Sequence, residues 1–355
     1  MRRALALARR GWGQVAPNPL VGAVVVKDGK VVGEGYHAAY GGEHAEVVAL
    51  RIAGELARGA TLYVSLEPCS HHGLTPPCTE AVLRAGVTSV VAATLDPNPA
   101  AGGGLELLAA RGLHVASGVE EAAARELNAA FFNRFTSDLP WVSLKLALSL
   151  DGAIADYTRR PGWLTNERSR RAVHRMRAGV DAIAVGIGTA LADDPQLTVR
   201  SGRAPRRAPL RVVLDRSCRL PLDSALVRTA RDVPVLVCTE QPESPAARAL
   251  VAAGVELLPA TDLSQVFREL RQRGVHSVLV EGGAGITGAL LMRNLVDRLV
   301  IFQAPVILGA GALGGFSLAP AVPATEARRL RVVAHQRIND DLLTTYALRH
   351  DDMEP

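Results

Sequence analysis

Four residues in the first part of the chain have the types and spacing needed for metal-assisted hydrolysis. His44 and Glu46 stand two positions apart in the stretch HAEVVAL, and Cys69 and Cys78 each follow a proline. One imidazole and two thiolates make three zinc ligands and leave the fourth tetrahedral position open, which is the catalytic rather than the structural arrangement. Zinc lowers the pKa of bound water, and Glu46 could carry a proton from that water to a leaving amine without binding the metal.

Zinc deaminases carry the signature H-x-E followed by P-C-x-x-C. This chain has both parts, but eight residues rather than two separate the cysteines. One alternative is an ordinary polar helix start with two core cysteines. Another is a structural site of two cysteines and two histidines that recruits His71 or His72, which would close the metal site and leave Glu46 idle. We therefore expect His71 to touch substrate rather than metal.

A second candidate motif is Gly-Ala-Gly-Ile-Thr-Gly at residues 283–288, which follows a predicted strand and opens a predicted helix. Backbone N–H groups at such a turn can cradle a phosphate. A dinucleotide-binding motif of the Rossmann type would lie at the first strand of its unit, with an acid about twenty residues further on. Neither condition is met, so a helix-packing turn stays open as the alternative.

These motifs need elements to position them, and strands alternate with helices throughout the chain. In the first half we predict two strands around the turn Asp28-Gly29, a helix over 44–58, a helix that ends at Gly86 with Pro77 near its first turn, and one long helix in EEAAARELNAAFFNRF. The second half repeats the alternation, with strand-like WVSLKLALSL, DAIAVGIG, LRVVLD, VPVLVC, GVELLPA and HSVLVEGG. The pattern predicts two α/β domains, residues 1–139 and 140–355, divided near 136–140.

The composition of the 355-residue chain is that of an ordinary soluble globular protein. It has no apolar run long enough to span a bilayer and only a short amphipathic N-terminal helix, so we expect a cytoplasmic protein without a membrane partner. Its four cysteines do not form a disulfide framework. The net charge is +5, but residues 1–139 hold 12 basic against 13 acidic residues, which argues against a nucleic-acid partner at the candidate zinc site.

Several stretches together resemble the bifunctional deaminase–reductase family of riboflavin biosynthesis. In the first half they are PNPLVGAVVVKDGKVVGEGYH, GGEHAE, LEPCSHHGLTPPC and DPNP; in the second they are VSLKLALSLDGAIA, WLTNERSRR, DAIAVGIGTALADDPQLTVR and LVEGGAGITGALL. The eight-residue spacing between cysteines is that family's variant. The resemblance implies a cytidine-deaminase-like zinc domain followed by a dihydrofolate-reductase-like domain.

The resemblance also implies a reaction sequence and a set of site residues. The first domain would remove the 2-amino group of a diaminopyrimidinone ribosyl phosphate, and the second would reduce its ribosyl group to ribityl with NADPH. The family is commonly a dimer or tetramer formed through its reductase domain, which we carry over here. In the deaminase, His44, Cys69 and Cys78 would bind zinc, Glu46 would be the catalytic proton shuttle, and Asn18, His37 and His71 would contact the pyrimidine. In the reductase, the substrate residues would be Lys145, Thr165, Arg177, Leu197, Arg200 and Glu281, and the cofactor residues Ala147, Trp163, Thr189, Asp193, Gly283, Gly285 and Gly288.

The chain departs from the family pattern at several positions. Leu74 stands where the family has a cation that meets the substrate phosphate, Pro161 replaces a serine of the reductase substrate site, and Arg216 replaces a small polar residue near the cofactor. The DPNP loop is one residue shorter than usual. A diverged relative in a pteridine- or azapteridine-type pathway therefore stays open, as do a nucleic-acid-editing deaminase, a zinc module without catalysis, and a nucleotide-binding second half without turnover.

Overall fold

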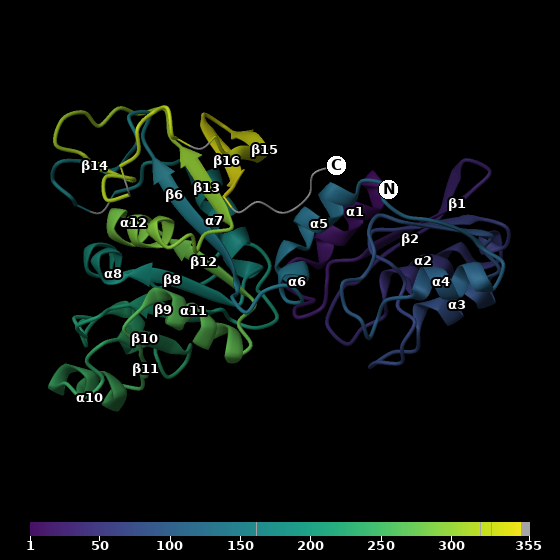
Figure 1. The fold of residues 1–355 in the computed structure, drawn as a ribbon, viewed down its shortest axis with the longest axis horizontal. Coiled ribbons are helices and arrows are strands. Elements are labelled where there is room, and N and C mark those ends of the chain that lie inside the picture. Colours follow the sequence, from purple (N-terminus) through teal and green to yellow (C-terminus); the bar gives the residue numbers. More distant parts are fainter. Residues whose placement is uncertain (161, 320, 328, 349–355) are drawn as a thin grey trace. The chain divides into compact units, whose positions relative to one another are not determined.

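The computed structural model describes residues 1–160, 162–319, 321–327 and 329–348. Its contacts divide the chain into two compact units, Met1–Ser137 and Asp138–Pro355 (Figure 1). This division falls inside the segment 136–140, where the sequence places the domain boundary. Within the described residues, every helix is too short or too polar to cross a bilayer.

The first unit is built on a five-stranded mixed sheet with the order β2-β1-β3-β4-β5. Its strands are β1 (Gly22–Lys27), β2 (Lys30–Tyr36), β3 (Thr61–Val64), β4 (Ser89–Ala92) and β5 (His114–Ala116). β1 pairs antiparallel with β2 and β3, while β3, β4 and β5 are parallel. The hairpin turn has positive φ at both Asp28 and Gly29, as the Asp-Gly sequence predicts for a two-residue β-turn.

Helices cover both faces of this sheet. They are α1 (Arg2–Ala8), α2 (Ala45–Ala53), α3 (Cys78–Ala85), α4 (Gly104–Ala110), α5 (Glu121–Leu127) and α6 (Ala129–Asn133), with the 3₁₀ helices η1 (Arg9–Gly11) and η2 (Gly54–Ala57). The apolar sides of α2, α3 and α4 share one core with Ala23 and Val25, whereas α1 packs on Val24 from the opposite face. A Cβ added at Gly35 would lie 2.3 Å from the Ala45 carbonyl oxygen, so this glycine lets α2 approach β2 closely.

The expected single helix in EEAAARELNAAFFNRF is wrong, because the structure divides it into α5 and α6 at Asn128. The Asn128 side chain is buried and bonds to the main chain of Leu20, accepting from its N–H at 2.7 Å and donating to its carbonyl at 2.9 Å. An asparagine that competes for backbone hydrogen bonds favours a helix end over a helix interior. Helical periodicity on both sides of Asn128 concealed this break.

The second unit contains a nine-stranded sheet with the order β11-β10-β9-β8-β12-β6-β13-β16-β15. The strands are β6 (Trp141–Leu148), β8 (Ala182–Gly186), β9 (Leu210–Leu214), β10 (Val235–Thr239), β11 (Glu256–Pro259), β12 (Ser277–Glu281), β13 (Arg298–Gln303), β15 (Arg331–Ile338) and β16 (Asp341–Ala347). All pairs from β11 to β13 are parallel, and β16 and β15 complete the sheet in antiparallel pairing. A small separate sheet joins β7 (Ala153–Ala155) to β14 (Leu313–Gly314).

The helices of the second unit lie on both faces of its large sheet (Figure 1). They are α7 (Glu167–Ala178), α8 (Ile187–Asp193), α9 (Ala225–Arg228), α10 (Pro245–Ala252), α11 (Leu263–Gln272) and α12 (Ala284–Met292). Alternate residues of β6, among them Leu144 and Leu146, share a core with α11 and α12. The residues between them face the other way, where Ala147 packs beside α7. Period-two alternation thus directs Lys145 and Ala147 toward the α7 face.

Candidate active sites

The structure brings His44, Cys69 and Cys78 together in the first unit. His44 is the N-cap of α2, Cys78 is the first residue of α3, and Cys69 lies in the connection after β3. His44 Nδ1 lies 3.1 Å from Cys78 Sγ and 3.6 Å from Cys69 Sγ. The three ligand atoms all lie within 4.8 Å of one another, and neither His71 nor His72 belongs to the group.

This geometry fits zinc. Bonds of about 2.0 Å to nitrogen and 2.3 Å to sulfur would place tetrahedral ligand atoms roughly 3.5 Å apart. The cluster also favours deprotonated sulfur, because hydrogen bonds from Cys78 and from His44 hold the pKa of Cys69 well below its ordinary value. The Cys78 backbone N–H at the start of α3 lies 3.4 Å from Cys69 Sγ, in the position of a donor. The interpretation of these residues as a polar helix start and two core cysteines gives no reason for this convergence.

Glu46 lies beside the cluster in the first turn of α2 and is 3% exposed. Burial raises the pKa of Glu46 to about 7, against the opposing effect of His44. Its Oε2 atom is buried without a hydrogen-bond partner. A buried carboxylate oxygen left without a partner is costly unless a ligand or water completes its contacts. The arrangement is suited to moving a proton at a metal-activated water.

Of the three predicted pyrimidine contacts, two lie together next to the cluster. Asn18 Nδ2 is 3.2 Å from His37 Nε2, and His37 Nδ1 is 3.1 Å from the Glu43 carbonyl oxygen. The His37 and His44 rings meet edge to face with centroids 5.4 Å apart. Burial lowers the pKa of His37, which favours a neutral ring that donates to Glu43 and accepts from Asn18. His71 is exposed, on the segment that joins the two cysteines.

The same segment carries Leu74, whose side chain is 75% exposed. His72 is also exposed, and its Nε2 lies 3.3 Å from a carboxylate oxygen of Glu80. Leu74 therefore occupies an open position that could hold a longer cationic side chain without loss of core packing.

In the second unit, Lys145, Glu281 and Arg177 form a charged cluster. Glu281 is paired in register with Lys145 on neighbouring parallel strands. The guanidinium of Arg177, from α7, donates to both Glu281 carboxylate oxygens at 2.5 and 3.0 Å, and both side chains are largely buried. Burial lowers the pKa of Lys145. Burial also acts to raise the pKa of Glu281, but Arg177 and Lys145 outweigh it, so this pKa lies below its usual value.

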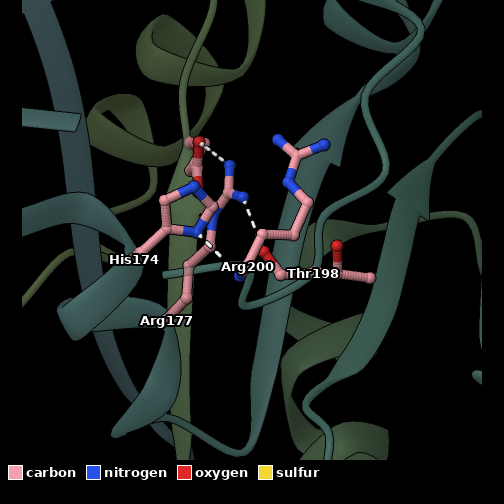
Figure 2. A network of polar contacts seen from close by, with 5 residues as sticks. His174, Arg177, Thr198 and Arg200 are labelled. Atoms are coloured by element: carbon pink, nitrogen blue, oxygen red, sulfur yellow. Dashed lines mark hydrogen bonds and ion pairs between the residues drawn. The ribbon is translucent and has the colours of Figure 1, made fainter. Parts of the chain in front are cut away.

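Arg177 also reaches the segment that follows α8. Its Nη1 donates to the Thr198 carbonyl at 3.0 Å, and the Arg200 N–H donates to Nδ1 of His174 at 3.3 Å (Figure 2). Arg200 itself is exposed, and its Nη1 donates to Gln196 Oε1. Leu197 is only 2% exposed and packs in a hydrophobic cluster, so its backbone rather than its side chain is available to a ligand. Sequence reasoning missed His174.

The predicted cofactor residues Trp163 and Asp193 and the predicted substrate residue Thr165 have different surroundings. Trp163 is 77% exposed, and Arg170 lies over its ring at 5.1 Å. Thr165 is nearly buried, with its carbonyl accepting from Arg170. Asp193 lies close enough to Lys145 for each charge to affect the other's pKa. Pro161 lies outside the described residues.

The three glycines of residues 283–288 have different surroundings. A Cβ at Gly288 would lie 2.1 Å from the Leu318 carbonyl oxygen, so packing explains this glycine, as the helix-packing alternative proposed. A Cβ at Gly283 would lie 2.8 Å from Thr189 Oγ1, whereas one at Gly285 would meet nothing within 4 Å. Gly285 lines a cavity of about 600 Å³.

This cavity lies where several parallel strands of the large sheet end, and sequence reasoning missed most of its lining. Its cationic side chains are Arg216, Arg219 and Arg293. Arg216 pairs with Glu240 at 2.8 Å and Arg293 with Asp262 at 3.1 Å, and both arginines are partly or largely exposed. The carboxyl ends of parallel strands are where open α/β sheets bind ligands. Gly186 and Gly188 also line the cavity. Their close spacing at the end of the strand-like stretch DAIAVGIG is the sequence feature that could have indicated a ligand site here.

Two protein-family models match separate parts of the chain. The family of cytidine and deoxycytidylate deaminase zinc-binding regions matches residues 1–94, and the RibD C-terminal domain matches residues 140–344. The riboflavin biosynthesis protein RibD of Aquifex aeolicus is 42% identical over 347 residues, which cover 97% of this chain and 96% of that protein. The corresponding Escherichia coli protein is 42% identical over 335 residues, covering 88% of this chain and 89% of its own length.

Solved structures agree over nearly the full length. The Thermotoga maritima diaminohydroxyphosphoribosylaminopyrimidine deaminase/5-amino-6-(5-phosphoribosylamino)uracil reductase has a TM-score of 0.85 and 38% identity, with coverage of 98% of this chain and 97% of that one. Acinetobacter baumannii RibD has a TM-score of 0.83 at the same identity and coverage. Fold and site thus define a two-domain enzyme, a cytidine-deaminase-like zinc domain followed by a reductase domain. The chain belongs to the RibD family, the bifunctional deaminase/reductases of riboflavin biosynthesis, whose reductase domain uses NADPH.

Proposed function

We propose that the first unit hydrolyses the 2-amino group of a 2,5-diaminopyrimidinone ribosyl phosphate, and that the second then reduces the ribosyl group to ribityl. The observation that carries the first step is the buried, unpartnered Oε2 of Glu46 beside the group of His44, Cys69 and Cys78. The name of the Thermotoga maritima relative, which specifies a phosphoribosylaminopyrimidine deaminase, supports the choice of substrate.

In the deaminase, His44, Cys69 and Cys78 would hold zinc, which when bound would supply a water of lowered pKa. Glu46 would accept the proton that the attacking water gives up and pass it to the departing amine, so that ammonia leaves and an oxygen takes its place. Asn18 and His37 bind the pyrimidine from the same side of the site, held by their mutual hydrogen bond. His71, on the exposed segment between the two cysteines, would contact the pyrimidine as well.

In the reductase, NADPH supplies the hydride that reduces the ribosyl carbon. The Lys145 ammonium, whose charge interacts with those of Glu281 and Asp193, donates a proton to the sugar oxygen. Burial lowers the pKa of Lys145, which makes the proton easier to transfer. Arg177 orients Glu281 toward the substrate, and Arg200 binds its phosphate through the planar fork of guanidinium donors. Thr165 and the Leu197 backbone complete the substrate contacts.

We propose that NADPH lies along the carboxyl edge of the large sheet. Gly285 offers the open backbone at the start of α12 for its diphosphate, next to Gly283 and Thr189. The cavity beyond, with Arg216 and Arg219, would hold the adenosine end. Ala147, Trp163 and Asp193 would contact the cofactor, and Gly288 allows α12 its close packing.

We further propose a homo-oligomer, a dimer or tetramer, formed through the second unit of a cytoplasmic protein. Exposed apolar side chains in two neighbouring segments of this unit support that interface, among them Leu150, Ile307 and Leu318. The Leu150 N–H donates to the Val306 carbonyl at 2.7 Å, which joins the two segments. Large apolar surface of this kind usually serves protein association.

The proposal is tested by incubating zinc-loaded protein with the phosphorylated diaminopyrimidinone, with and without NADPH, and following products by mass. We expect exchange of the amino group for oxygen without NADPH, and a further gain of two hydrogens with it. Deamination of the dephosphorylated compound alone would refute the proposed substrate. Failure to reduce the supplied deaminated intermediate would refute the role of the second unit.

A further inference from the structure

His174 and Arg177 lie one helical turn apart on α7 and both contact the segment 194–200 that carries Arg200. Arg177 Nη1 donates to the Thr198 carbonyl at 3.0 Å, and His174 Nδ1 accepts from the Arg200 N–H at 3.3 Å. Figure 2 shows the two α7 side chains directed toward this segment. Of these contacts, only that of His174 is made to Arg200 itself.

The segment has a backbone that needs such contacts. Asp194 and Leu197 have φ values of 37° and 50°, in the left-handed region that non-glycine residues rarely adopt. Strained backbone persists where the surrounding structure over-determines it. Arg211, fully buried on β9, donates to the Gln196 carbonyl. Arg211 and Arg177 therefore fix the middle of the segment, and His174 fixes its end.

We propose that His174 is a positioning residue for the reductase: its neutral ring accepts from the Arg200 backbone and thereby aims the Arg200 guanidinium at the substrate phosphate. This inference rests on the proposed function, in which Arg200 binds that phosphate. The Arg200 side chain is exposed and has Gln196 Oε1 as a 3.0 Å partner on the same segment. A shift of the Arg200 main chain would therefore displace the guanidinium group that binds the phosphate.

The charges around His174 favour the form that the proposal requires. Burial, Arg177 on its own helix and Arg200 on the facing segment lower the pKa of His174, while Glu281 on β12 and a hydrogen bond with the Thr198 carbonyl oppose this. The net pKa lies below the ordinary value of 6.5, so the ring is neutral at pH 7. Protonation would convert the acceptor nitrogen into a donor facing the Arg200 N–H and would add a third cation beside Arg177 and Arg200. The contact is therefore retained above the His174 pKa and lost as the pH falls through it.

The first test compares two substitutions in the full-length enzyme, with the deaminated phosphorylated intermediate supplied and NADPH oxidation followed. His174→Phe fills the volume without an acceptor, and His174→Asn retains an acceptor close to the Nδ1 position. Loss of one hydrogen bond predicts that His174→Phe raises the KM for this intermediate about tenfold with little change in kcat. His174→Asn should return KM to near the wild-type value.

The second test is the pH dependence of KM for wild type and His174→Asn, because the asparagine cannot titrate. Wild-type KM should rise more steeply than that of the variant as the pH falls through the His174 pKa, which lies below the ordinary imidazole value of about 6.5. The substrate phosphate, Lys145 and Glu281 are present in both experiments, so their effects cancel in the ratio of wild-type KM to variant KM. His335→Asn, at an exposed histidine on β15 of the same unit, is the matched control and should retain the wild-type profile.

Four outcomes decide the inference. Unchanged KM in His174→Phe, or equal impairment in the phenylalanine and asparagine variants, would overturn it. If His174→Phe does not fold, the pH profiles of KM for wild type and His174→Asn decide the question. Profiles that diverge at low pH support the acceptor role, and parallel profiles refute it. A wild-type enzyme that fails to reduce the intermediate would instead refute the proposed function itself.

Discussion

Replacing Leu74 with arginine should improve the use of phosphorylated substrate by the deaminase. Leu74 is 75% exposed, and the resemblance to the family implies a cation at this position. A substitution at so open a site should change the free energy of unfolding by no more than about 0.5 kcal/mol. Any change in activity would therefore come from the new charge rather than from altered packing.

The size of the effect follows from the exposure of the site. A hydrogen bond to a charged group contributes about 1.5–3 kcal/mol, whereas exposed ion pairs contribute about 0–1 kcal/mol. A contact to phosphate at the rim of the site lies between these limits, at about 1–1.5 kcal/mol. This corresponds to a KM lowered roughly 5- to 12-fold.

The assay is the deaminase kcat/KM for the phosphorylated and the dephosphorylated pyrimidine, measured at low and high salt. Leu74→Arg should raise the preference for the phosphorylated compound, and the gain should shrink at high salt because the charge is exposed to screening. Leu74→Gln, of similar size without charge, is the control. An equal change for both substrates, or an equal effect of glutamine, would refute the phosphate-contact reasoning.

The remaining predictions concern catalysis and packing. Glu46→Gln should lower deaminase kcat about 10²- to 10⁴-fold while bound zinc and reduction of supplied intermediate stay unchanged; residual deamination within tenfold of wild type would contradict the proton-carrier role. Gly288→Ala should destabilise the second unit by about 1–3 kcal/mol, because its Cβ would lie 2.1 Å from the Leu318 carbonyl oxygen. Calorimetry should record a lower Tm for Gly288→Ala and no decrease for Gly285→Ala, whose Cβ meets nothing within 4 Å; equal Tm values would argue against the close packing.

The metal-ligand geometry was predictable because residue type and the order of elements determine it. His44 and Cys78 stand at the starts of two helices, α2 and α3, that pack on the same face of the sheet. The order of these elements therefore brings the two side chains close together. The charged pair of Lys145 and Glu281 depends instead on which strands become neighbours, and only the resemblance to a family supplied it. Strand periodicity gives the face of each residue but not the neighbour of each strand.

Other features had no distinctive sequence signal. Asn128 divides a helical pattern because Leu20, distant in sequence, offers backbone partners that the pattern does not contain. His174 is one histidine on a polar helix, and its importance comes from a segment that returns to it after α8. Arg219 contributes to a cavity formed by several strand ends, so no local spacing identifies it.

The left-handed residues of segment 194–200 also bear on the thermodynamics of substrate capture. Fixing the backbone of one residue costs about 1–2 kcal/mol of conformational entropy. Arg177, Arg211 and His174 hold this segment through its own main chain in the protein alone, so that entropy is lost during folding and not at the encounter with substrate. Association should accordingly be rapid and show little of the unfavourable entropy that accompanies loop ordering.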